Sequence, residues 1–72
     1  MADAETHIER AERHVQEGAR RIAELRSRIA ELEYHGHAKA AALARQLLET
    51  LEQTQKLALE HVRIEHEMHP RK

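Results

Sequence analysis

Histidine is the residue type in this chain that could take part in the widest range of chemistry. Seven of the 72 residues are histidines, and an imidazole can bind a divalent metal or change its charge near neutral pH. His66 and Glu67 resemble the start of the zinc motif HExxH. The second histidine of that motif comes one residue too early, at His69, and Pro70 stands in its place. A metalloprotease is therefore excluded.

A different metal site is conceivable at the open end of a helical hairpin. Histidine and glutamate recur there at intervals of four, which places them on one helical face, and a hairpin would bring the first histidine-bearing turn close to them. The candidate ligands are His7, His61, Glu65, His66 and His69. The alternative interpretation is a set of solvated surface residues, and on that basis we predict no metal site and no cofactor. Protonation near pH ~6 would make clustered histidines repel one another, so pH sensitivity is a further hypothesis.

Other catalytic arrangements are missing from the sequence. No glutamate stands three residues before a histidine, as the di-iron four-helix bundles require. There is no cysteine, which excludes disulfides and thiolate metal sites. Neither a Ser/His/Asp grouping nor a glycine-rich phosphate loop occurs. We therefore expect no enzymatic activity and assign no catalytic or cofactor-binding residue.

The charge balance argues against nucleic acid or membrane as a partner. Lys and Arg number 12 and Asp and Glu 13, so the strong basic excess of a nucleic-acid-binding domain is absent. The longest apolar run, residues 40–44, is far too short to span a bilayer. The first residues lack the basic and apolar regions of a signal peptide. The expectation is a soluble cytoplasmic protein.

These residues must be positioned by two helical arms, which form a single domain over residues 1–72. The first arm, about 3–35, has apolar residues at helical steps of three, four and seven, with Asp3 as its expected N-cap. Gly36 suits the left-handed position that ends a helix, so residues 35–37 are predicted to form a turn. The second arm, about 38–68, is rich in strong helix formers and ends before Pro70. Gly18 interrupts the first apolar stripe, either as a tolerated weak spot or because another helix approaches closely there.

The second arm carries two apolar stripes. Leu43, Leu47, Leu51, Leu57 and Ile64 are predicted to face Ile29, Leu25, Ile22, Val15 and Ile8 of the first arm. The numbers of each facing pair add up to 72 or 73, as an antiparallel pair folded at residue 36 requires. The predicted fold is therefore all-α, an antiparallel helical hairpin or two-helix coiled coil.

The second stripe of this arm has no expected partner within one hairpin. It contains Ala41, Leu48, Gln55, Leu59 and Val62, with Leu51 on its border. Packing two hairpins into a four-helix bundle would bury it, so a homo-oligomer, with a dimer favoured, is expected. The predicted interface residues are Leu48, Leu51, Leu59 and Val62.

Several strings in the chain carry a resemblance. They are Ile22-Ala23-Glu24-Leu25, Ile29-Ala30-Glu31-Leu32-Glu33 leading into Gly36-His37, and Leu47-Leu48-Glu49-Thr50-Leu51. With them the chain resembles short bacterial hypothetical proteins of the helical-hairpin type with a central Gly-His turn. The resemblance implies a hairpin and no activity.

The sequence thus favours a non-enzymatic, self-associating helical interaction or scaffold protein. Two alternatives stay open. One is a small regulatory protein that offers the second stripe to a partner's helices and masks them. The other is a histidine-based binder of divalent metal ions.

Overall fold

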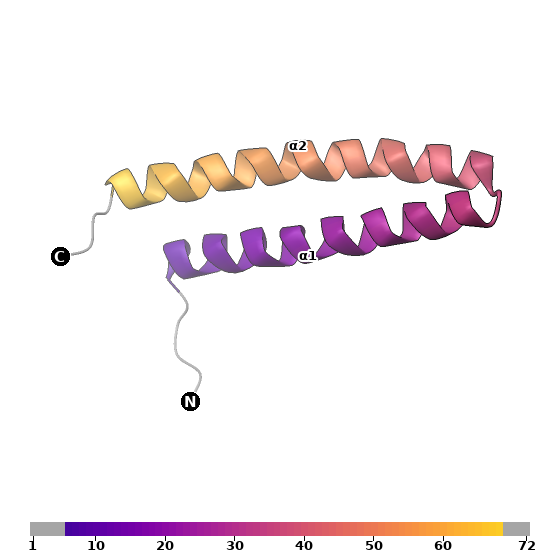
Figure 1. Cartoon of the computed structure of the whole chain (residues 1–72). Helices are drawn as coiled ribbons and strands as arrows, with labels where there is room; N and C mark the ends of the chain where they lie inside the picture. Colours follow the sequence, from indigo (N-terminus) through magenta and orange to yellow (C-terminus); the bar gives the residue numbers. More distant parts are fainter. Residues whose placement is uncertain (1–5, 69–72) are drawn as a thin grey trace, which may run out of the picture.

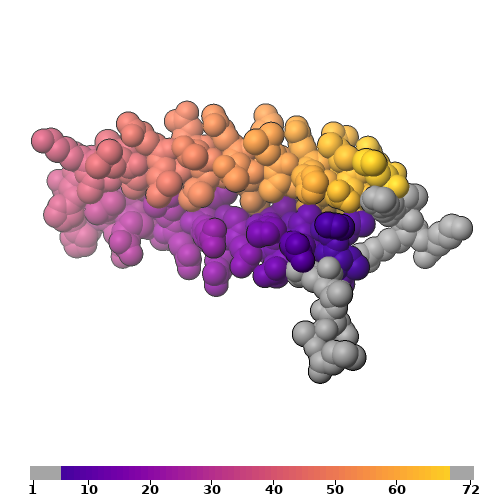
Figure 2. Space-filling model, turned by 180° about the vertical axis from the view of Figure 1, so that it is seen from behind, coloured from indigo at the N-terminus to yellow at the C-terminus, as the bar shows by residue number. Residues whose placement is uncertain are grey.

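The computed structural model describes residues 6–68, and these form two long helices joined by a tight turn. Helix α1 spans His7–Tyr34 and helix α2 spans Ala38–Met68. The two helices run antiparallel and lie side by side along the length of α1, and the C-terminal end of α2 extends past the start of α1 (Figure 1). The space-filling view shows them as two touching rows of side chains rather than as a layer around a central core (Figure 2). The predicted all-α hairpin is confirmed.

Helix α1 begins with a capping box that the sequence interpretation overlooked. The Glu9 backbone N–H donates to the Thr6 hydroxyl at 3.0 Å, and the Thr6 N–H donates to the Glu9 carboxylate at 2.9 Å. Each bond satisfies a backbone donor that a helix start would otherwise leave unpaired. The helix therefore starts later than predicted, and the expected cap, Asp3, lies outside the described residues. The Thr-x-x-Glu spacing was the available sequence signal.

The turn has the geometry predicted for it. Gly36 has a φ of 75°, in the left-handed region that glycine adopts without strain. The His37 N–H donates to the Leu32 carbonyl at 2.8 Å and the Gly36 N–H donates to the Glu33 carbonyl at 3.1 Å. These two bonds form a Schellman motif, which satisfies the last carbonyls of α1. The His37 carbonyl then accepts from Ala41 at 2.9 Å and opens α2.

Substitution of Gly36 tests this turn. A Cβ at residue 36 would meet nothing within 4 Å, so any strain arises in the backbone alone. We expect Gly36→Val to lower the free energy of unfolding by about 1–2 kcal/mol. Gly36→Asn should cost less because asparagine tolerates this conformation. Urea unfolding followed by circular dichroism measures both, and a Val variant as stable as the unaltered protein would contradict the left-handed turn.

The seam between the helices follows one regular pattern on both sides. Buried and half-buried residues alternate at steps of three and four, the spacing of a coiled coil. On α1 they are Ile8, Ala11, Val15, Gly18, Ile22, Leu25, Ile29 and Leu32. On α2 they are Ala41, Ala44, Leu48, Leu51, Gln55, Ala58, Val62 and Glu65. Gly18 lies against Gln55, so the predicted antiparallel register is correct.

The predicted face of α2, by contrast, is wrong for four of its five residues, and only Leu51 lies in the seam. Leu43, Leu47, Leu57 and Ile64 are not packed on α1 but are 67%, 52%, 67% and 44% exposed. The residue that follows each of them occupies the seam instead, which corresponds to a rotation of α2 by about 100°. Three of the eight seam positions of α2 are alanines, Ala41, Ala44 and Ala58, so the larger apolar residues of this helix are not all on its inner face. Choosing the bulkiest stripe of α2 as its inner face therefore selected the wrong one.

Candidate interaction surface

The two long edges of the hairpin differ in chemistry. On one edge, the closed flank, polar pairs cross from α1 to α2: Arg26 with Glu52, Glu33 with Arg45, and Glu12 with His66, the last at 3.1 Å. All three share one register, because each step of seven along α1 is matched by an equal step back along α2. Exposed pairs of this kind contribute about 0–1 kcal/mol each. Their main effect is to close this edge and to fix the register.

The opposite edge, the open flank, carries a stripe of exposed apolar side chains from α2. Leu47 and Leu57 line hollows between the helices on this edge, and the remaining members follow at helical steps of four and seven. The stripe consists of Leu43, Leu47, Leu57, Ile64 and Met68. Within residues 6–68 the other large exposed apolar residues are Tyr34 and Leu59. Apolar exposure is thus concentrated on one edge of one helix.

The outward face of α2 is polar, so the apolar stripe does not belong to a helix that is hydrophobic on all sides. All seven residues of that face are exposed and carry a charge or an amide. They are Gln46, Glu49, Gln53, Lys56, Glu60, Arg63 and Glu67. Single exposed leucines are ordinary on protein surfaces. An apolar stripe beside a wholly polar face is the pattern of a helix with a second buried side.

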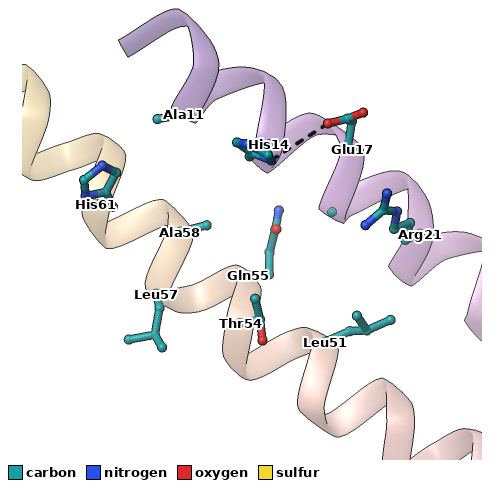
Figure 3. Close-up of a pocket in the computed structure, with 11 residues that line it drawn as sticks. Ala11, His14, Glu17, Arg21, Leu51, Thr54, Gln55, Leu57, Ala58 and His61 are labelled. Atoms are coloured by element: carbon teal, nitrogen blue, oxygen red, sulfur yellow. Dashed lines mark ion pairs between the residues drawn. The ribbon is translucent and has the colours of Figure 1, made fainter. Parts of the chain in front are cut away.

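A groove of about 510 Å³ opens between the helices on the open flank. Small residues from both helices, Ala11, Gly18 and Ala58, leave the space, and Leu57 and His14 are among the larger residues around it. Figure 3 shows Gln55 extending from α2 across this space toward α1, while the Leu57 side chain points away from α1. The groove therefore lies directly beside the apolar stripe.

Gln55 crosses the seam because Gly18 leaves room for it. Its amide Nε2 donates to the Val15 carbonyl at 2.7 Å, which gives a part-buried polar group a partner. A Cβ on residue 18 would overlap the Gln55 Oε1 atom. Of the two interpretations of Gly18, the structure supports close approach. A polar layer of this kind favours one register of the two helices over shifted ones.

The coupling of these two residues makes the effect of Gly18→Ala depend on Gln55. Gly18→Ala should be close to neutral in the unaltered chain, because a helix-propensity gain of about 1 kcal/mol offsets the lost hydrogen bond, also about 1 kcal/mol. In a Gln55→Ala background the same substitution should stabilise by about 1 kcal/mol, since no side chain then competes for the space. Urea unfolding of the four proteins measures the cycle. Equal effects of Gly18→Ala in both backgrounds would contradict the contact.

Among the described residues, the structure does not bring the candidate metal ligands together. His66 pairs with Glu12 on the closed flank, and His61 Nε2 lies 3.7 Å from Glu65 Oε1. His7 is exposed at the start of α1, and His69 lies outside the described residues. Within residues 6–68 no three histidine, aspartate or glutamate side chains converge on a point where a metal ion would fit.

The four predicted interface residues are divided between two places. Leu48, Leu51 and Val62 are half-buried in the seam, where they already pack within the chain. Leu59 is exposed, but it lies beside Glu12 and Val62 at a shallow hollow on the closed flank. The regular steps of three and four between seam residues of α2, together with its polar outward face, were the sequence signal for the inner face of this helix. This signal would have assigned the inner and the exposed stripe the other way round.

Neither helix has, within residues 6–68, an apolar segment of the length needed to cross a membrane. Comparisons of the chain with protein-family models, with curated proteins and with solved structures gave no match.

Proposed function

We propose that this chain is a non-enzymatic interaction protein of the cytoplasm that self-associates, with the open flank of one hairpin packed on the open flank of another. Two hairpins joined in this way form a four-helix bundle. The observation that carries the proposal is the exposed stripe of Leu43, Leu47, Leu57, Ile64 and Met68 beside a polar outward face.

The hairpin by itself buries few apolar residues, and covering the exposed stripe supplies the driving force for self-association. Its buried apolar residues in the described part are Ile8, Ala11, Ile22, Ile29 and Ala41, two of which are alanines. Each stripe residue still exposes about half of its side chain or more, and covering that half contributes about 1 kcal/mol. Five such residues add about 5 kcal/mol per chain, which is comparable to the whole stability of a small domain.

A second copy of the chain fits the dimensions of the open flank. The stripe from Leu43 to Met68 is roughly 38 Å long at 1.5 Å per residue, and two adjacent helices are roughly 20 Å wide. The resulting area of about 760 Å² matches the roughly 800 Å² that each partner buries in a stable dimer. The arms of another hairpin, with 28 and 31 residues, are at least as long as this stripe.

Sedimentation equilibrium of the unaltered protein tests the proposal. At micromolar concentrations we expect a mass of 16.8 kDa, twice the 8.4 kDa of one chain. A mass that stays at 8.4 kDa at every concentration would overturn self-association. That result would favour the alternative in which helices of a different protein cover the stripe.

A further inference from the structure

We infer, on the basis of the proposed self-association, that the second copy docks with α2 against α2 and α1 against α1, each pair antiparallel. The two-fold axis then crosses the helices near Thr50. This arrangement follows from how apolar and charged residues are distributed over the open flank.

The open flank is apolar along α2 and charged along α1. The exposed or half-buried residues that α1 contributes to it are His14, Glu17, Arg21, Glu24, Arg28 and Glu31. Two hairpins can stack face to face about a two-fold axis in two ways. An axis along the helices lays α2 over α1 of the second copy and covers the apolar stripe with charges. An axis across the helices lays each helix on its own copy, so that apolar residues meet apolar residues.

The charges of α1 are complementary to themselves in the second arrangement. An antiparallel pairing of two α1 helices, centred between Ile22 and Ala23, places opposite charges against each other at two levels and an imidazole against a carboxylate at a third. Arg21 lies opposite Glu24 of the second copy, Arg28 opposite Glu17, and His14 opposite Glu31. Each of these pairs occurs twice because of the two-fold symmetry. Complementary charges of this kind select the orientation of a complex.

The same centre pairs the first part of the apolar stripe, from Leu43 to Leu57, with itself, while Ile64 and Met68 lie beside the turn of the second copy. Because Gly18 faces Gln55, the point between Ile22 and Ala23 lies opposite Thr50 and its neighbour Leu51. Leu43 then approaches Leu57 of the second copy, and Thr50 approaches its own equivalent. The Thr50 hydroxyl donates to the Gln46 carbonyl at 3.3 Å within its own helix. A second copy can therefore cover Thr50 without leaving its hydroxyl unpaired.

Single-cysteine variants test this geometry, because the chain has no cysteine of its own. Thr50→Cys should form a disulfide-linked dimer almost completely under mild oxidation, since the two positions meet at the axis. His61→Cys is the matched control: His61 is also exposed on the same edge of α2, but its two copies lie roughly 30 Å apart at 1.5 Å per residue. A disulfide requires Cα atoms within about 7 Å, so this variant should not link.

The outcomes separate the docking geometry from self-association itself. If the unaltered protein is a dimer but Thr50→Cys fails to link, or both variants link equally, the docking geometry is overturned and the proposed function stands. If the unaltered protein is a monomer, both are overturned.

Charge reversal gives a second, independent test. Arg21→Glu should weaken association by about 10-fold or more, because the glutamate faces Glu24 of the second copy. The double variant Arg21→Glu with Glu24→Arg should return the affinity to within a few-fold of the unaltered protein. Arg20→Glu, one residue away on the outward face of α1, should have little effect. A double variant as weak as Arg21→Glu alone would overturn the pairing of α1 with α1.

Discussion

Leu47→Glu is expected to dissociate the protein into monomers, whereas Leu59→Glu is expected to leave its association unchanged. The two leucines lie on the same helix and are each 52% exposed within one chain, but they occupy opposite flanks. Either substitution therefore costs the single hairpin a similar amount, about 1 kcal/mol for the half of the side chain that each leucine buries. In the bundle, Leu47→Glu would remove two leucine side chains from the interface and desolvate two carboxylates there, which costs several kcal/mol. Leu59 stays at the solvated closed flank.

Sedimentation velocity at one fixed micromolar concentration distinguishes the two variants, and circular dichroism confirms that both stay helical. Dissociation by Leu59→Glu, with Leu47→Glu still associated, would contradict the assignment of the open flank as the interface. That outcome would instead support the interface predicted from the sequence, to which Leu59 belongs.

Ala41→Glu is expected to destabilise the hairpin by at least about 2 kcal/mol, whereas Ala42→Glu should change its stability by less than about 0.5 kcal/mol. Ala41 is the most completely buried residue of the described chain, at 1% exposure, and lies where α2 meets the end of α1. Ala42 is exposed. A carboxylate at residue 41 must either push the helices apart or remain buried without a partner. Both positions lie near the start of α2, so the helix dipole affects them similarly.

The comparison is cleanest in a Leu47→Glu background, where dissociation has removed the contribution of the second copy. Thermal unfolding of the two variants at the same protein concentration then reports packing within one hairpin alone. Equal destabilisation by both substitutions would show that α2 does not present Ala41 to α1, and the face of α2 derived from the structure would be wrong.

The sequence was sufficient for the hairpin, its turn and its register. Gly36 identified the turn because few other residues adopt a left-handed backbone without strain. The regular apolar steps of α1 identified its inner face, since that helix has only one apolar stripe. These features depend on local backbone chemistry and on the period of one helix, both of which are encoded in short segments.

The inner face of α2 could not be identified in the same way, because this helix has two apolar stripes. Leu43 and Leu47 are larger than Ala44 and Ala58, and burying larger residues is the more favourable choice for an isolated helix. The choice depends instead on the pairing with α1, whose seam residues meet a mixture of alanines and larger residues of α2. Gly18 follows the same logic, because its role depends on Gln55, which is remote in sequence. The inner face of α2 and the role of Gly18 are therefore determined by how the two helices pair, and neither can be deduced from one helix alone.

The most direct test of the central claim is to measure which leucine side chains solvent can reach in the unaltered protein. Methyl NMR with a soluble paramagnetic probe reports this for each labelled leucine at micromolar and higher concentrations. The open flank is predicted to be covered, so the methyl groups of Leu47 and Leu57 should be protected from the probe while those of Leu59 are strongly relaxed. Equal relaxation of Leu47 and Leu59 would contradict the account.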